Sequence, residues 1–293
     1  MRRHLVWTVA VLFAAGPGAA AADAWPSRSS ADRESGYAGG RGLISYSGQT
    51  GMFLNPTSGT ARAGDLSLQS CALVFGFDGK TVVSHAGLAT YGVTDWLEIG
   101  LFGIGVYGAP KDAGGPGSGP GGPGPGPGPG PGGGPGGGSG IKSTMGAAQG
   151  NLRLRLLKDE GGLPEISVGG MYRAGDGWLR QEQLFVAASK GFDLDPAGPV
   201  RAIRFHAGFR QLWQDRNFRE RDGSIVFGGI DVALPWNLHL VGEVSSKDDV
   251  YPRTPFSVGI QWRDPRGFGA SLAFVRSDDW GEDGAYVGIG FNF

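Results

Sequence analysis

The sequence has little of what many functional sites require. Cys71 is the single cysteine, so the chain cannot form an internal disulfide or a cysteine-based zinc site. The four histidines are scattered and show no metal-ligand spacing. Lys and Arg number 26 against 27 Asp and Glu, so no basic surplus points to nucleic acid as a partner. We therefore expect no cofactor, no metal site and no nucleic-acid-binding surface.

Long apolar runs are also missing, except at the start of the chain. Arg2 and Arg3 precede an apolar run from Leu5 to Ala15, and small residues lead to Ala20–Ala22. These features are typical of a cleaved secretory signal peptide, which we predict over residues 1–22. The run is shorter than the roughly 20 residues of a transmembrane helix. A mature chain that crosses a membrane would then do so with strands, because only helices and closed barrels pair every backbone group in lipid.

The last residues of the chain alternate as a strand with one apolar face does. The sequence ends on Phe293, with Phe291 two residues before it and Gly288 five before it. This ending resembles the C-terminal signal by which outer-membrane β-barrels are recognised for assembly. The resemblance implies that Gly288, Phe291 and Phe293 form an assembly signal. It also implies the barrel-assembly machinery and outer-membrane lipid as partners, and the bacterial outer membrane as location.

Glycine is abundant, and much of it lies in one segment. From Gly114 to Gly140 nearly every residue is Gly or Pro, without the strict three-residue repeat of collagen. Such a segment cannot bury enough apolar surface to fold. We predict a disordered loop at 113–140, a flexible periplasmic lead at 23–42 and a barrel over 43–293.

About 12 further segments alternate between apolar and polar residues, with lengths that suit tilted membrane strands. Leu152 and Leu154, for example, alternate with Arg153 and Arg155. The expected strands are 65–77, 81–92, 96–107, 143–157, 163–172, 182–192, 200–213, 224–234, 238–245, 255–263, 268–276 and 285–293. The sequence thus predicts an all-β fold, a single antiparallel transmembrane β-barrel of about 12 strands. A soluble barrel with its apolar faces inward is the alternative that the pattern alone leaves open.

The connections between these segments alternate in length. Val93–Asp95 and Pro235–Asn237 are short turns, whereas Gln214–Gly223 and Ser246–Thr254 are longer and more polar. Outer-membrane barrels have short periplasmic turns and longer outer loops. The Gly/Pro-rich loop belongs to the longer set, so we expect it outside the cell.

Charged residues fall on the predicted inward faces. The expected lumen charge cluster is Glu98, Arg153, Arg155, Arg204, Arg210 and Glu243, with Glu165, Arg173 and Arg263 on the same faces. About eight strands leave room only for side chains and roughly 16 to 18 leave an open channel, so twelve fall between. We favour a lumen filled by paired charges, while the arginine excess leaves a narrow path for acidic solutes open. The sequence does not decide whether residues 43–64 fold into the lumen as a plug.

A catalytic serine would need a histidine beside it. Ser84 and His85 are adjacent in sequence and therefore face opposite sides of a strand. His206 and His239 lie at predicted lumen positions with no serine within reach on their own strands. We expect no catalytic residues and no enzyme.

Three short patches carry a family resemblance. Residues 48–66 contain a "TG…PT…G.L" opening, and residues 91–100 read Tyr-Gly-Val-Thr-Asp-Trp-Leu-Glu-Ile-Gly. Later, Leu240–Glu243 followed by Phe256–Arg263 is similar to an "aE…GlryR" hairpin. These patches resemble the YjbH-type outer-membrane proteins and related bacterial barrels. The resemblance implies a link to exopolysaccharide production or export, with polysaccharide or its export proteins as partners.

Three functions follow as hypotheses. The first is a non-enzymatic outer-membrane barrel linked to exopolysaccharide export or envelope organisation. The alternative is a small passive pore for polar or acidic solutes. The third, an outer-membrane lipid-modifying enzyme, is the least favoured because the sequence shows no nucleophile beside a base.

Overall fold

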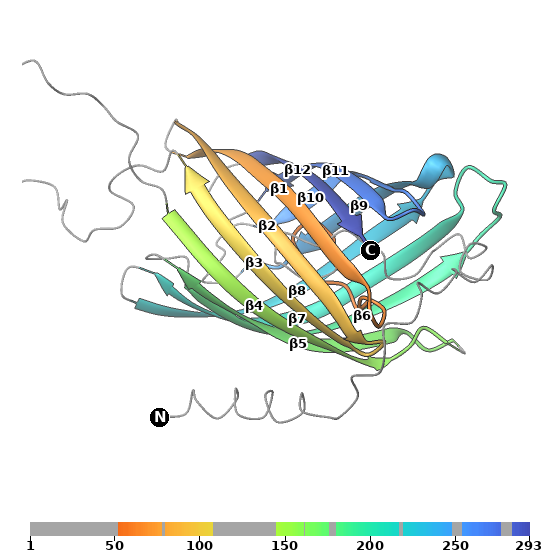
Figure 1. Ribbon diagram of the computed structural model, residues 1–293, viewed down its shortest axis with the longest axis horizontal. Helices are drawn as coiled ribbons and strands as arrows, with labels where there is room; N and C mark the ends of the chain where they lie inside the picture. The colour runs from red at the N-terminus through yellow and green to blue at the C-terminus, as the bar shows by residue number, and fades with distance from the viewer. Residues whose placement is uncertain are drawn as a thin grey trace, which may run out of the picture.

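The chain folds into a closed barrel of twelve antiparallel strands (Figure 1). The computed structural model describes residues 52–77, 80–107, 145–160, 162–175, 180–216, 219–247, 254–276 and 283–293. Each strand pairs with its neighbours in sequence, and β1 pairs with β12 to close the ring. The strands are β1 (Leu66–Phe77), β2 (Lys80–Thr94), β3 (Leu97–Tyr107), β4 (Met145–Leu157), β5 (Glu165–Gly175), β6 (Gln181–Asp193), β7 (Ala202–Arg216), β8 (Arg219–Ala233), β9 (Leu238–Ser245), β10 (Phe256–Arg263), β11 (Phe268–Arg276) and β12 (Asp283–Asn292). The predicted fold class is confirmed.

Three predicted segments cannot be compared with this structure. The signal peptide (1–22), the periplasmic lead (23–42) and the Gly/Pro-rich loop (113–140) lie outside the described residues. They stay predictions.

One predicted outer loop is wrong. The sequence predicts a polar loop over residues 214–223, but β7 continues to Arg216 and β8 begins at Arg219. The ladder between the two strands continues through this stretch, with Gln214 opposite Arg221. The residues from Gln214 to Gly223 are mostly polar, and a strand without apolar alternation has the sequence pattern of a loop.

The outward face of the barrel is apolar along the middle of its strands. Large apolar side chains there are strongly exposed, for example Leu101 at 69% and Val226 at 60%. Soluble monomers rarely expose so many contiguous apolar side chains, whereas a lipid-facing wall requires them. Four aromatic side chains near the ends of strands are also exposed: Trp96, Tyr107, Trp236 and Trp262. Aromatic rings at such positions are typical of the two interfaces between a membrane and water. In the described part of the chain, no helix is both long and apolar enough to span a membrane.

The wall of the lumen is polar on some strands and apolar on others. Most of the buried charged and amide side chains lie on β4–β10. The inward positions of β1–β3, β11 and β12 instead form an apolar cluster that includes Leu73, Phe75, Val82, Phe102 and Tyr286. The expectation of a polar lumen therefore holds for only part of the wall. Strands that are apolar on both faces show no alternation, so the sequence pattern did not reveal this side.

Candidate functional site

A segment that precedes the first strand occupies the lumen. Met52, Phe53, Asn55 and Ser58 are at most 2% exposed, although none of them belongs to a strand. The Phe53 ring packs edge-on against Tyr286 of β12, with ring centroids 5.5 Å apart. We call residues 52–64 the plug. The structure thus answers, for these residues, the question that the sequence left open.

Glu243 on β9 anchors the tip of the plug. Its carboxylate accepts hydrogen bonds from the backbone N–H of Leu54 at 2.5 Å and of Asn55 at 3.0 Å. Asn55 Nδ2 donates a third at 2.9 Å, and the hydroxyl of Ser257 a fourth at 2.6 Å. An ionised carboxylate has about four lone-pair sites, so these donors satisfy it fully inside the barrel.

The middle of the plug is held by charged groups of β3 and β4. Glu98 and Arg153 lie directly opposite each other in the ladder between these strands. Glu98 accepts a hydrogen bond from the backbone N–H of Ala61 at 2.8 Å, and Arg153 donates to the carbonyl oxygen of Gly59. Arg153 is only 1% exposed, and a charge buried so deeply is tolerated only when it is paired and hydrogen-bonded. The plug is therefore held by Glu98 and Arg153, and it supplies some of the hydrogen bonds that these buried charges need.

The turn between β2 and β3 clamps the end of the plug. Gly64 N–H donates to Gly92 O at 2.8 Å, and Ala63 N–H donates to the Asp95 carboxylate at 3.0 Å. A Cβ atom on Gly92 would lie 1.8 Å from the carbonyl oxygen of Arg62, so only glycine fits this close approach. Much of the first two resemblance patches, residues 48–66 and 91–100, thus forms the plug and its clamp.

Charged side chains form a network, here called the mouth network, at the end of the barrel that carries the turn after β4. Arg155 contacts Glu165 at 3.2 Å, and Arg204 lies 3.7 Å from Glu165 and 3.8 Å from Asp159. Lys190 contacts Asp159 at 2.6 Å. These pairs join four strands with the turn after β4.

Asp159 lies in a turn outside the membrane-spanning strands. Burial raises the pKa of its carboxyl group, but hydrogen bonds from Lys190 Nζ at 2.6 Å and Gly191 N–H at 2.8 Å outweigh this. Attraction to Lys190 and Arg204 acts in the same direction. The pKa of Asp159 therefore lies below its ordinary value.

All six residues of the predicted lumen charge cluster point inward, but they do not form one cluster. Glu98, Arg153 and Glu243 hold the plug, whereas Arg155 and Arg204 belong to the mouth network. Arg210 is 7% exposed on β7 and lies farther from the mouth network, toward the end of the strand at Arg216. Arg173, on the same half of the wall, donates to Gln149 at 3.0 Å and lies over the ring of Phe102.

Two polar groups could not be identified from the sequence, because their partners lie on other strands. Asp231 on β8 contacts His239 and Arg263, each at 2.8 Å. The hydroxyl of Ser189 on β6 lies 2.7 Å from Nδ1 of His206 on β7. A search along single strands cannot find such pairs, since the register between strands is needed. Within the described ranges, no group of three or more His, Cys, Asp or Glu could hold a metal ion.

The residues of the predicted assembly signal lie on β12 and at the end of the chain. Gly288 faces inward beside the Tyr286 side chain. Phe291 packs edge-on against Phe268, with centroids 5.1 Å apart. Phe293 exchanges backbone hydrogen bonds with Leu66 at the seam of the barrel. Their role in assembly stays a prediction.

Comparison with known proteins shows a shared fold. No protein-family model and no curated protein sequence matches the chain. A KdgM porin is similar in structure, with 8% sequence identity and a TM-score of 0.50 over 78% of this chain and 99% of that chain. A KdgM porin in complex with disordered oligogalacturonate shows 9% identity and a TM-score of 0.48 over the same shares. LpxR from Salmonella typhimurium shows 9% identity and a TM-score of 0.42 over 78% of this chain and 99% of that chain. At these identities the likeness concerns the fold alone, which is that of the outer-membrane β-barrels.

Proposed function

We propose that the protein is a small passive pore of the bacterial outer membrane for polar or acidic solutes, narrowed by its own plug. The observation that carries this is the lumen wall on the extracellular half of β4–β7. Arg173 and Arg210 lie there among the amides of Gln149, Gln183 and Gln214. Among the described inward side chains of this part of the wall there is no carboxylate. Guanidinium groups in a low-dielectric lumen attract anions and recognise carboxylates with paired hydrogen bonds.

The plug fits a narrow pore. Twelve strands enclose more space than the eight that side chains alone can fill. The plug takes up part of that space, because it runs across the lumen between Glu98 on β3 and Glu243 on β9, which lie on opposite sides of the ring. Arg173 and Arg210 lie on β5 and β7, between those two strands. The KdgM porin has a similar fold, which supports the proposal that this barrel is also a pore.

Ion selectivity tests this function. The barrel would be reconstituted in planar bilayers, and the reversal potential measured across a KCl gradient. We expect small conductance steps with a preference for chloride, weakened in the double variant R173Q/R210Q. R276Q is the matched control, because Arg276 lies on the outward face of β11 and pairs with Asp283 at 2.6 Å. Heat-modifiable barrels that never conduct, or that prefer potassium, would overturn the proposal.

A barrel linked to exopolysaccharide export is the second candidate. It rests on the resemblance to the YjbH-type proteins, and one structural observation favours it: two of the resemblance patches lie against each other as plug and clamp. Deleting the gene should lower secreted polysaccharide, and the wild-type gene should restore it. Unchanged polysaccharide would reject this candidate and leave the pore untouched.

For the pore and the polysaccharide candidate alike, we propose a non-enzymatic barrel. The buried pair of Ser189 and His206 lies under the plug, where the backbone N–H of Ser58 donates to the same serine hydroxyl at 3.2 Å. That contact occupies the oxygen atom that would have to attack a substrate.

A further inference from the structure

A hydrogen-bonded polar pair lies on the outward wall of the barrel. Ser70 Oγ on β1 and His85 Nε2 on β2 are 3.0 Å apart, and both side chains are exposed. Two exposed tyrosines near strand ends give their depth: Tyr91 lies toward the periplasmic end of β2, and Tyr107 lies opposite Val83 near the extracellular end. His85 is two residues from Val83, or about 7 Å along the strand. The pair therefore reaches into the outer-leaflet half of the membrane, where unpaired polar groups are costly.

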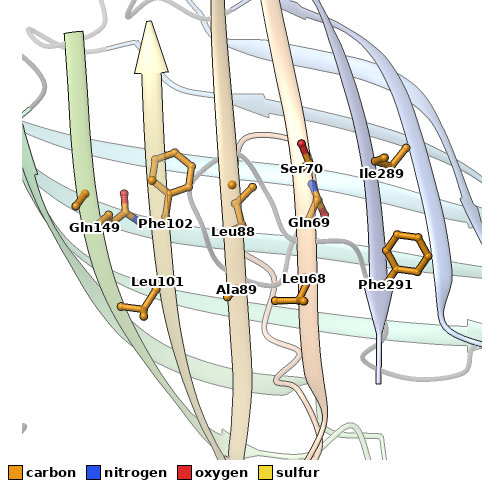
Figure 2. A pocket seen from close by; sticks show the side chains of 13 residues that line it. Leu68, Gln69, Ser70, Leu88, Ala89, Leu101, Phe102, Gln149, Ile289 and Phe291 are labelled. Carbon is orange, nitrogen blue, oxygen red and sulfur yellow. The ribbon is translucent and has the colours of Figure 1, made fainter. Parts of the chain in front are cut away.

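A groove lies beside this pair. Gly87 and Gly103 form its floor, and a Cβ atom added to either would meet no atom within 4 Å. Leu68, Leu101, Ile289 and Phe291 are among the larger side chains around it, and Ser70 also lines it. Figure 2 shows that the lining side chains come from neighbouring strands of the wall. Its volume of about 670 Å³ lies within the range of about 300–1,000 Å³ that is usual for small-ligand sites.

The pair has the composition of a nucleophile and a base, but the surroundings do not suit catalysis. Acyl transfer depends on donors that stabilise the oxyanion, most often free backbone N–H groups. Ser70 is in mid-strand, paired with Gly87 on one side and Ile289 on the other, so the backbone around it is part of the ladders. Among the described residues, Ser70 is the one hydrogen-bond partner of His85. A binding role fits this geometry better than hydrolysis.

The chemistry of the pair defines its ligand. If Ser70 donates to His85, the Nδ1–H of the ring remains available as a donor; if His85 donates, the Ser70 hydroxyl hydrogen remains. In either arrangement one donor is left over in a lipid-facing groove. At this depth the acceptor that the membrane offers is the carbonyl oxygen of an acyl ester. From the pair, the groove extends toward Leu68 and Phe291, nearer the periplasmic rim, which is the direction in which an outer-leaflet acyl chain points.

We propose that this groove binds one acyl chain of an ester-linked outer-leaflet lipid, and that the Ser70–His85 pair donates a hydrogen bond to its ester carbonyl. The site is separate from the lumen and stands whether or not the lumen conducts.

Photo-crosslinking tests where the chain binds. The full barrel would be reconstituted in phosphatidylethanolamine vesicles containing a phosphatidylcholine with a mid-chain diazirine, and the labelled peptides identified. We expect labelling concentrated on β1–β3, and a several-fold loss in G103L, whose new side chain fills the floor. A207L is the matched control on the outward face of β7. Even labelling around the barrel, or equal labelling of G103L and A207L, would overturn the proposal.

A second measurement tests the hydrogen bond itself. Native mass spectrometry would compare retention of an ester-linked phospholipid with that of its ether-linked analogue, which lacks the carbonyl group. The wild-type barrel should retain the ester lipid roughly three- to tenfold better, and S70A/H85A should abolish that preference while keeping its heat-modifiable fold. Equal retention of both lipids by the wild-type barrel would show that the Ser70–His85 pair does not bind the ester carbonyl, and would overturn that part of the proposal.

Discussion

Asn55 and Glu243 are 188 residues apart in the chain, yet Glu243 Oε2 accepts hydrogen bonds from both the backbone N–H and Nδ2 of Asn55, at 3.0 Å and 2.9 Å. Asn55 belongs to the plug, which leads into β1, and Glu243 lies on β9, four strands away around the ring. The contact therefore bridges the lumen. The plug therefore fills part of the lumen, and the remaining space lies between the plug and the polar part of the wall.

Replacing Glu243 by alanine should loosen the plug. The change leaves the N–H groups of Leu54 and Asn55 without their acceptor, and each buried unpaired donor costs about 1–3 kcal/mol. We expect a barrel that still assembles but shows larger conductance steps. Asp222→Asn is the control, since Asp222 is exposed on the outward side of β8. Channels of unchanged size in the Glu243→Ala variant would show that this contact does not limit the lumen.

Arg153→Met should destabilise the barrel strongly. It leaves Glu98 buried without the cation opposite it, and breaking such a pair lowers the free energy of unfolding by about 3–5 kcal/mol. The double variant E98Q/R153M should recover part of this loss, because it removes the stranded charge. Urea unfolding in detergent, followed by the shift between folded and unfolded bands on a gel, measures both. A single variant as stable as the wild type would contradict the structural role of this pair.

The mouth network should weaken in acid. The pKa of Asp159 is lower in the folded barrel than in the unfolded chain, so its stabilisation is complete above the unfolded value of about 3.9 and is lost as the pH falls through the lower folded value. Asp159→Asn should therefore lower stability near neutral pH and flatten the acid limb of the unfolding curve. Parallel acid limbs in the wild-type protein and the Asp159→Asn variant would show that Asp159 does not carry this dependence.

Two glycines of β2 make a matched pair. Gly92→Ala should displace the plug from its clamp, because the added Cβ would overlap the carbonyl oxygen of Arg62, and strain of this kind costs about 1–3 kcal/mol. Gly87→Ala should be tolerated, since its added methyl group faces open space. Thermal gel-shift midpoints compare the two. Equal midpoints would argue against a tight approach of plug and turn at Gly92.

Deleting Phe293 should lower the amount of folded barrel in the outer membrane. The residue is the suspected recognition element of the assembly signal, and its backbone also closes the seam with Leu66. Phe274→Ala serves as the control, because it removes an outward aromatic of β11 that is exposed to a similar degree, at 42% against 53%. Fractionation and immunoblotting give the amounts. If the amount of folded barrel equals that of the wild type after the deletion, Phe293 is not needed for recognition.

The sequence predicted the strands well because alternation reports directly on a wall between two different media. Its clearest examples, such as the Leu152–Arg155 run, are now part of β4 with Arg153 inward. Alternation does not reveal which face points inward where both faces of a strand are apolar, as at Leu73 and Phe102. It also does not reveal a strand whose residues are mostly polar, as in the hairpin that joins β7 and β8.

The candidate site was predictable only in part. The alternation predicts that Glu98 and Glu243 point inward. It does not predict their partners in the plug, because these are backbone N–H groups, which almost every residue type has. The pairs Ser189–His206 and Ser70–His85 join neighbouring strands at positions that register alone determines. Their residues were visible in the sequence, whereas their proximity was not.

In the proposed pore, the lumen conducts ions and residues 52–64 narrow it. The most direct test is single-channel recording in planar bilayers of the full chain and of a chain lacking residues 52–61, after both show the heat-dependent gel shift of a folded barrel. We predict small steps for the full chain and clearly larger steps, with the same preference for anions, for the shortened chain. If both barrels fold and neither conducts, the lumen is not a pore, and the polar side chains of the wall fill the barrel instead of lining a path.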